Sequence, residues 1–415
     1  MKSVIFITGS FYPKSSANSN CIKNIIDVFD KDYELIVIHI NNQSEVSKFI
    51  GNYKIESVVQ SKNAKRESII KIKKNESQYL KYFYIFLHLV IRFKGFFLAH
   101  FKINNVDNDL IKSYTKKLNQ IQDVHAIIPA CLPIEGLIAA TDFKKLQKVK
   151  VIPVLFDKFS ANNTLHRTSF NKSLKFKRHL AIEKDIIETS DAIIHVDSWS
   201  DHLNSYFSEY KDKFNLIEHP LLKEFKNNTP LVFNKYKTNF IYTGALYNKL
   251  RSPKGMFNSF EKVFSENKNV VLHLYTRGDC NSLIDKFSKL YPENVINYGS
   301  VNSDTANSAM SGANFLLSIG NTDITQLPSK IFEYISTGKP IIHFFTEDND
   351  PIIPILKKYE NSLLISTKKE NPDVIADKIN KFITRPMKTV SFEQTSKIYH
   401  DATPEYTKDI LLKLL

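Results

Sequence analysis

Runs of apolar residues alternate along the chain with segments in which apolar residues recur at helical spacing. In the first half, the runs that predict strands are Val4–Thr8, Glu34–His39, Ala126–Pro129, Val149–Phe156 and Asp191–Val196. The segments between them that predict helices are Cys21–Phe29, Asp109–Gln120 and Phe176–Glu188. Apolar strands that alternate with helices are typical of parallel sheets covered on both faces, which is an α/β architecture.

This pattern fades over Lys223–Thr238, where Asn, Lys and Pro dominate, and then starts again. The second half predicts strands at Asn239–Tyr242, Val270–Tyr275, Val295–Tyr298, Phe315–Ser318 and Ile341–Phe345. Helices are expected at Met256–Phe264, Thr305–Ser311 and Phe392–Leu415. We therefore expect two doubly wound, Rossmann-like domains, 1–228 and 229–390, that face each other across a cleft with ligands at the strand C-termini.

Composition narrows the classes of partner. The 415 residues exceed a usual single core, and 57 Lys and Arg against 43 Asp and Glu indicate an anionic partner, although a genome rich in Lys codons would give the same excess. We find no RNA-binding or helix-turn-helix signature, so we do not expect nucleic acid. Three widely spaced cysteines predict neither a disulfide nor a metal site, which fits the cytoplasm. We see no signal peptide and no run of 18 apolar residues, so nothing is expected to span a membrane.

The segment Gln326–Ile342 predicts a short helix with both ends marked. Pro328 suits its first turn, and Gly338 suits the left-handed conformation that ends a helix. The free N–H groups near Pro328 and Ser329 would bind an anion such as a diphosphate. Glu333 follows about 7 Å along the axis and could accept the hydroxyls of a ribose. The pattern indicates a nucleotide-sugar site; the alternative is that Lys330 and Glu333 form an exposed ion pair of little consequence.

The same segment resembles the donor-binding helix of retaining glycosyltransferases with the GT-B fold, particularly family 4, which carry a P-S-K-x-x-E-Y-x-x-x-G-K-P run in the C-terminal domain. The resemblance implies that Glu333 matches the glutamate that binds the donor ribose, and that segment 391–415 returns to the first domain. Many members carry another glutamate eight residues earlier, where this chain has Thr325. Members with a Gly-Asn pair ahead of the run often lack that acid, and Gly320–Asn321 is such a pair.

Three further segments of the second domain are candidates for the donor site. After the strand that ends at Gly244, a basic loop could hold a diphosphate through Arg251 and Lys254, to which we assign catalytic charge stabilisation. Family 4 members usually have arginine directly after the glycine, where this chain has Ala245. Ser300 and Val301 resemble the turn that holds the base, and Arg277 is expected at a strand end. Ordinary turns and solvated charges would explain these residues equally well.

In the first domain, the polar loop Gly9–Asn20 stands where the family has a glycine-rich loop. We expect Ser15, Ser16 and Asn18 to bind the acceptor, although helix capping explains such residues equally well. Asp157 follows a predicted strand and is a third catalytic candidate. No Asp-x-Asp motif stands out, in agreement with the metal-independent chemistry that the resemblance implies, and we expect no cofactor beside the nucleotide-sugar co-substrate.

The aromatic segment 79–101 is interrupted by Arg92 and Lys94 and preceded by basic residues. It fits a helix that lies on an anionic membrane surface, where a lipid-linked acceptor would reside. A long core helix is the competing interpretation.

Together these features predict an enzyme that moves a sugar from a nucleotide diphosphate donor, with a UDP-sugar favoured, to a glycan acceptor in cell-surface polysaccharide synthesis. Two alternatives stay open. One is a nucleotide-sugar epimerase of the same fold. The other is a degenerate GT-B subunit that binds glycan or a catalytic partner, which Ala245 and Thr325 would support.

Overall fold

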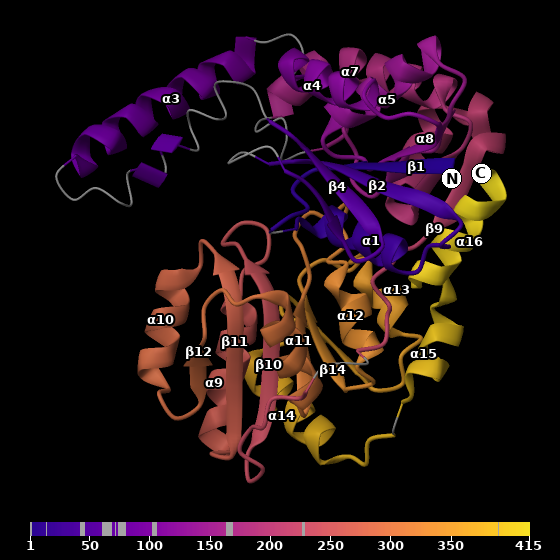
Figure 1. Cartoon of the computed structure of the whole chain (residues 1–415). Coiled ribbons are helices and arrows are strands. Elements are labelled where there is room, and N and C mark those ends of the chain that lie inside the picture. Colours follow the sequence, from indigo (N-terminus) through magenta and orange to yellow (C-terminus); the bar gives the residue numbers. More distant parts are fainter. Residues whose placement is uncertain are drawn as a thin grey trace. The chain divides into compact units, whose positions relative to one another are not determined.

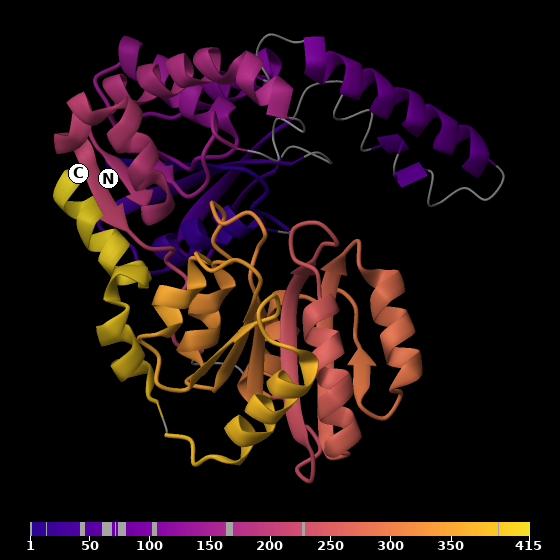
Figure 2. The ribbon, with the colours of Figure 1, turned by 180° about the vertical axis from the view of Figure 1, so that it is seen from behind.

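The computed structural model describes residues 2–13, 15–41, 46–59, 69–70, 72–73, 80–101, 106–162, 169–225, 229–388 and 390–415. They divide into two compact units, each with a six-stranded, largely parallel sheet that has helices on both faces (Figures 1 and 2). Unit 1 comprises Met1–Pro220 with Pro404–Leu415, and unit 2 comprises Leu221–Thr403.

The larger sheet of unit 1 has six strands in the order β3-β4-β2-β1-β5-β6. Their bounds are β1 Lys2–Thr8, β2 Tyr33–Ile40, β3 Ser47–Ile50, β4 Tyr53–Val58, β5 Val124–Pro129 and β6 Lys150–Val151. All neighbours pair in parallel except β3 with β4. The central strand β1 carries fully buried Val4, Ile5 and Phe6, because helices cover both of its faces.

A smaller sheet of unit 1 has the order β7-β8-β9, with β7 at Val154–Leu155, β8 at Ile193–Val196 and β9 at Phe214–Ile217. The expectation of one strand over Val149–Phe156 is therefore wrong. The chain leaves the larger sheet after β6, passes Ile152 and Pro153, and enters the smaller sheet as β7. Pro153 has no N–H for a sheet ladder, which accounts for the change of sheet at this point.

The helices of unit 1 are α1 Ala17–Asp27, α3 Lys81–Phe101, α4 Asn108–Leu118, α5 Ile134–Leu146, α7 Ser169–Thr189, α8 Ser200–Tyr206 and α16 Pro404–Leu414. Short 3₁₀ turns lie at Asp197–Trp199 and Ser208–Lys213. The larger sheet has α1 on one face and α4 and α5 on the other (Figure 1). On the latter face, Leu110 and Tyr114 of α4 and Phe143 of α5 join the strand side chains in one apolar core.

The sheet of unit 2 has six parallel strands in the order β12-β11-β10-β13-β14-β15. The strands are β10 Thr238–Leu246, β11 Val270–Gly278, β12 Val295–Asn297, β13 Phe315–Ile319, β14 Ile341–Phe345 and β15 Ser362–Ser366. The order reverses direction at β10 and β13, which is the switch point where parallel sheets of this kind bind ligands beyond the strand C-termini.

The helices of unit 2 are α9 Lys254–Glu266, α10 Asn281–Leu290, α11 Ser303–Gly312, α12 Lys330–Ser336, α13 Ile352–Leu356, α14 Pro372–Thr384 and α15 Phe392–Ile398. Helices α9 and α14 lie on one face of the sheet, and α11 and α12 lie on the other (Figures 1 and 2). Phe260 of α9 and Ile379 of α14, both fully buried, pack with the strand residue Phe240 in the core.

The sequence predicted one helix over Phe392–Leu415, but the structure has two helices there. Helix α15 ends at Ile398, a 3₁₀ turn covers His400–Ala402, and α16 begins at Pro404. Proline at the start of α16 fits this interruption, since it lacks the N–H that a continuing helix needs. Within the described residues, none of the helices has both the length and the apolar character needed to cross a membrane.

Candidate functional site

The end of β10 is fastened to α12 by a buried tyrosine. The hydroxyl of Tyr334 donates to the backbone oxygen of Thr243 at 3.0 Å and accepts from the backbone N–H of Thr243 at 2.9 Å. Gly244 follows with φ +146°, a conformation that L side chains rarely adopt. These contacts hold the strand end and the short helix in register, so residues on both are fixed relative to one another.

Helix α12 differs slightly from the sequence prediction at its start and agrees with it at its end. It begins at Lys330 with Ser329 as the preceding cap residue, so Pro328 lies ahead of the first turn rather than within it. Gly338 has φ +69°, the left-handed conformation expected of it. A Cβ there would lie 2.2 Å from the backbone oxygen of Val390, which is a second reason for glycine at this position.

Arg251 is tied to the loop that precedes α12. Its Nε donates to Oδ1 of the buried Asn321 at 3.0 Å, and Nδ2 of Asn321 donates to the backbone oxygen of Gln326 at 2.7 Å. The backbone of Arg251 also pairs with that of Tyr247 in both directions, at 3.1 and 2.8 Å. The guanidinium is therefore placed by side-chain and backbone bonds together.

Lys330 and Glu333, in the first turn of α12, form the ion pair named above as the alternative interpretation. Nζ of Lys330 is 2.9 Å from Oε2 of Glu333, and both side chains are partly exposed. Burial raises the pKa of Tyr242 to about 12, while the charges of Arg251 and Lys330 act on the same hydroxyl in the opposite direction. Nη1 of Arg251 and the hydroxyl of Tyr242 both donate to the backbone oxygen of Ala245, at 3.5 and 3.1 Å. We call Arg251, Asn321, Lys330 and Glu333 the Arg251 cluster.

Charges of the same cluster act on Tyr334, which follows Glu333 in the sequence. Burial raises the pKa of Tyr334 to about 12; its bonds to Thr243 oppose this shift, Glu333 adds to it and Arg251 opposes it. The structure therefore brings together two cations, one carboxylate and one amide at the switch point of the sheet. Such a group can neutralise a diphosphate and accept hydroxyl groups beside it.

The other candidates for the donor site lie around the same edge of the sheet. The exposed Lys254 begins α9. Burial raises the pKa of the Cys280 thiol to about 11, and the positive charge of Lys254 opposes this shift. Arg277, also exposed, lies beside Ala245 in the strand register. Ser300 and Val301 follow β12 and the left-handed Gly299.

Two more candidates belong to the loop before α12. Gly320 fits its position because a Cβ would lie 1.8 Å from Oδ2 of the buried Asp350. Thr325 is exposed, and its hydroxyl donates to Oδ1 of Asp323 at 2.6 Å, so its side chain takes part in the turn.

The structure adds an aromatic pair that the sequence argument did not single out. The rings of Tyr275 and Tyr298 stack in parallel with centroids 4.3 Å apart and planes within 2°. Tyr298 is exposed and directly precedes Gly299 and the predicted base-binding turn. Aromatic residues ending two neighbouring strands were the signal available in the sequence.

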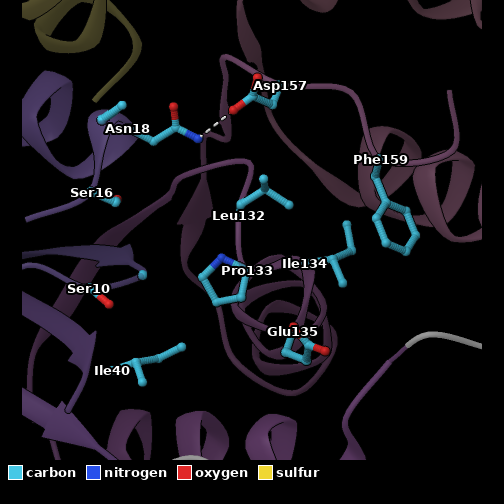
Figure 3. A pocket seen from close by; sticks show the side chains of 12 residues that line it. Ser10, Ser16, Asn18, Ile40, Leu132, Pro133, Ile134, Glu135, Asp157 and Phe159 are labelled. Atoms are coloured by element: carbon cyan, nitrogen blue, oxygen red, sulfur yellow. Dashed lines mark hydrogen bonds between the residues drawn. The ribbon is translucent and has the colours of Figure 1, made fainter. Parts of the chain in front are cut away.

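Unit 1 contains a pocket of about 520 Å³ at the end of β1 and the start of α1 and α5. Figure 3 shows the side chains that line it. Its walls are largely apolar, and its polar members are Ser10, Ser16, Asn18, Glu135 and Asp157. We call it the Asn18–Asp157 pocket, because the amide of Asn18 donates to Oδ2 of Asp157 at 2.9 Å (Figure 3).

This amide–carboxylate pair is held from below by a buried thiol. The backbone N–H of Asp157 and the amide of Asn18 both donate to Sγ of Cys131 at 3.3 Å. Burial raises the pKa of Cys131 to about 12, so the thiol is neutral near pH 7. Burial also raises the pKa of Glu135, whose carboxylate accepts the backbone N–H of Asp107 at 2.8 Å. The carboxyl oxygens of Asp157 and Glu135 provide acceptors for hydrogen bonds from hydroxyl groups in the pocket.

The serines of the Gly9–Asn20 loop differ in position. Ser16 lines the pocket and also caps α1 by accepting the N–H of Ser19 at 3.2 Å, so the capping interpretation is confirmed and a role in acceptor binding stays a prediction. Ser15 donates to the side chain of Asn20 and is not among the pocket residues. Sequence reasoning missed Glu135 and the whole of α5. The signal was Pro133 ahead of an acid in the first turn, a usual start for a helix.

No protein-family model and no curated protein sequence matches this chain. Several solved structures are similar to it along nearly their whole lengths. Sucrose-phosphate synthase from Thermosynechococcus elongatus aligns with a TM-score of 0.63 at 10% identity, covering 100% of this chain and 99% of that one. A putative UDP-N-acetylglucosamine 2-epimerase from Listeria monocytogenes aligns at 0.58 and 10%, covering 99% and 95%. HepE from Anabaena, in complex with UDP, aligns at 0.56 and 12%, covering 100% of both chains.

Proposed function

We propose that this chain, which has the GT-B fold, is a glycosyltransferase that takes a sugar from a nucleotide diphosphate donor, with a UDP-sugar favoured, and transfers it to a glycan acceptor. The similar structures include one protein named for a nucleotide sugar and another that was solved in complex with UDP. The observation that carries the proposal is the Arg251 cluster at the switch point of unit 2, where Arg251 bonds to Asn321 of the loop before α12 and Lys330 pairs with Glu333 in the first turn of α12.

The chemistry of the proposal is charge stabilisation of the leaving group. As the bond from the anomeric carbon to the diphosphate breaks, negative charge grows on the phosphate oxygens, and Arg251 and Lys330 neutralise it. Arginine can bind a phosphate through two N–H groups, and lysine supplies a point charge. Helix α12 has only seven residues, so we give its dipole a smaller share than these side chains. The carboxylate of Glu333 accepts hydrogen bonds from the ribose hydroxyls.

We propose a retaining, metal-independent reaction in which the acceptor hydroxyl attacks from the face that the diphosphate leaves. The cationic side chains of unit 2 take the role that a divalent ion would otherwise fill. The acceptor is a glycan of cell-surface polysaccharide synthesis, free or lipid-linked, on the cytoplasmic side of the membrane. The Asn18–Asp157 pocket of unit 1 supports this assignment for two reasons. Its carboxylates can accept hydrogen bonds from sugar hydroxyl groups, and its apolar walls suit the faces of sugar rings.

A thermal-shift panel with UDP, GDP, ADP and their sugars tests the donor class. We expect UDP or a UDP-sugar to raise the unfolding temperature, because a ligand that binds only the folded state stabilises it. Release of UDP from the stabilising sugar, unchanged by EDTA, then tests turnover without a metal. A panel in which no nucleotide changes the unfolding temperature would contradict the proposal.

The epimerase alternative has one specific observation in its favour, the likeness to a putative UDP-N-acetylglucosamine 2-epimerase. An epimerase that removes and returns a proton on the sugar would incorporate solvent deuterium at the epimerised carbon. We expect no deuterium in the recovered UDP-sugar. A binding subunit would be recognised by a nucleotide-dependent thermal shift with no release of UDP from any donor.

A further inference from the structure

Helix α3 carries an apolar stripe that faces solvent rather than the core of unit 1. At 3.6 residues per turn, Tyr82, Phe86 and Leu89 recur along one side of the helix, and Phe83 and Val90 widen that side. Tyr82 is 82% exposed, Phe86 64% and Leu89 57%, whereas core residues of this unit are fully buried. We call these five residues the aromatic stripe. The exposure contradicts the interpretation of the helix as a core element.

Cationic side chains lie on both sides of the aromatic stripe. Arg92 and Lys94 are exposed and, by helical position, flank it on opposite sides, while Lys81 lies in the first turn. The sequence contains no Asp or Glu from Leu80 to Val106, and Lys71, Lys73 and Lys74 precede the helix. The surface is therefore both apolar and positively charged. Such a combination matches the interface of an anionic bilayer, where rings enter the headgroup boundary and cations meet lipid phosphates.

We propose that α3 is a membrane-docking helix that lies flat on a bilayer containing anionic lipid, with the aromatic stripe inserted at the interface and Arg92 and Lys94 at the headgroups. Arg92 and Lys94, in the middle of the helix, disfavour a spanning orientation. This inference goes beyond the glycosyl-transfer proposal and does not depend on it, because it concerns a surface of unit 1 distant in sequence from the Arg251 cluster. Lipid vesicles without any nucleotide are sufficient to test it.

Flotation separates the electrostatic and apolar parts of the interaction. We expect the full chain to float with vesicles of phosphatidylcholine and phosphatidylglycerol, to float poorly with phosphatidylcholine alone, and to lose binding in high salt, which screens surface charge. Phe86→Ser with Leu89→Ser should weaken binding at least about tenfold, since two large apolar groups leave the interface. Arg92→Gln and Lys94→Gln should each weaken it about fivefold on anionic vesicles.

Matched controls change equally exposed residues elsewhere. Leu146→Ser and Leu290→Ser remove exposed leucines of α5 and α10, and Lys289→Gln removes an exposed cation; all three should float as the unchanged chain does. Because the α3 residues are exposed, circular dichroism and the unfolding temperature should not change in any variant. A chain that stays at the bottom with both vesicle types, or a double variant that floats normally, would overturn the proposal.

A fluorescent reporter gives the depth of the helix independently. The sequence has one tryptophan, Trp199, which is 2% exposed, so a second one at α3 is readily distinguished. In a Phe86→Trp variant we expect a blue shift on anionic vesicles and quenching by brominated lipid, while Leu146→Trp should show neither. Light scattering tests the alternative that the aromatic stripe binds a second copy of the chain. This alternative would replace the proposal if the unchanged chain is a dimer that does not bind vesicles and if the Phe86→Ser, Leu89→Ser variant is a monomer.

Discussion

The candidate sites of the two units differ in the kind of side chain that forms them. In unit 2, charged groups of the Arg251 cluster are placed by bonds to a buried amide and by the fastening of α12 through Tyr334. In unit 1, the Asn18–Asp157 pocket has largely apolar walls, and a neutral thiol accepts from the amide of Asn18 and the backbone N–H of Asp157. The chain has a formal charge of +14, yet the charged residues among those described as lining the pocket are the acids Glu135 and Asp157. The difference suits a diphosphate at unit 2 and hydroxyl groups at unit 1.

The largest effect expected is that of Arg251→Ala. We expect UDP release from the donor to fall about 100-fold, the scale of losing one preorganised charge-stabilising group. Initial rates at saturating donor measure this loss. Arg251→Lys should recover part of the rate because the charge remains while the donor bond to Asn321 changes.

Lys249→Ala is the matched control for Arg251, because Lys249 is an exposed cation two positions earlier on the same loop. It should leave the rate unchanged. Equal losses for Lys249→Ala and Arg251→Ala would mean that the general charge of the loop, rather than the position of Arg251, supports the reaction, and the contrast between the units would weaken.

The next effect concerns Glu333. Glu333→Ala should weaken UDP binding by about 1–3 kcal/mol, the cost of losing a charged hydrogen-bond partner. Calorimetric titration with UDP and with 2′-deoxy-UDP gives a double-mutant cycle that isolates the ribose contact. If Glu333 binds the ribose 2′-hydroxyl, the variant should bind both ligands almost equally. Unchanged affinity for every nucleotide diphosphate tested would refute the ribose role.

The two units also differ in how much of them the sequence predicts. In unit 2, the strand Ile341–Phe345 and the left-handed Gly338 were found where expected, because apolar runs and a glycine end signal are local in sequence. The bond between Arg251 and Asn321 joins residues 70 positions apart, and no local pattern specifies such a pair. The ion pair of Lys330 with Glu333 could be anticipated from its helical spacing, whereas the bond between Arg251 and Asn321 could not.

In unit 1, more was missed, for physical reasons. Helix α5 is buried on nearly every side, so it lacks the polar face that makes a helix visible in sequence. The split at Pro153 turns one apolar run into strands of two sheets, since continuous hydrophobicity does not say which sheet a residue joins. The pocket could be anticipated only at Asn18, Ser16 and Asp157, which the resemblance and the strand-end rule had already singled out.

Moderate effects are expected on the stability of each unit when one buried tyrosine is changed. Tyr334→Phe leaves a buried N–H and C=O of Thr243 without their hydroxyl partner and should lower the free energy of unfolding of unit 2 by about 1–3 kcal/mol. Tyr114→Phe removes one bond, to the backbone oxygen of Thr8 at 3.2 Å, and should cost unit 1 about 1 kcal/mol.

Urea unfolding distinguishes these variants because the single tryptophan, Trp199, belongs to unit 1. If the units unfold separately, Tyr114→Phe should shift the fluorescence transition and Tyr334→Phe only the circular-dichroism transition. If both variants shift both signals equally, the two units unfold as one cooperative body.

The smallest effect on donor binding is expected from unit 1. Asp157→Asn keeps the size of the side chain and an oxygen that can accept the amide of Asn18, so the pocket should retain its shape. UDP affinity should change less than about twofold, while the Michaelis constant of the acceptor should rise about tenfold, because a hydroxyl donor bonds more strongly to a carboxylate than to an amide. Calorimetry with UDP and acceptor-dependent rates measure the two quantities on one preparation. A tenfold loss of UDP affinity would place Asp157 at the donor site. It would contradict the assignment of anion binding to unit 2 and of hydroxyl binding to unit 1.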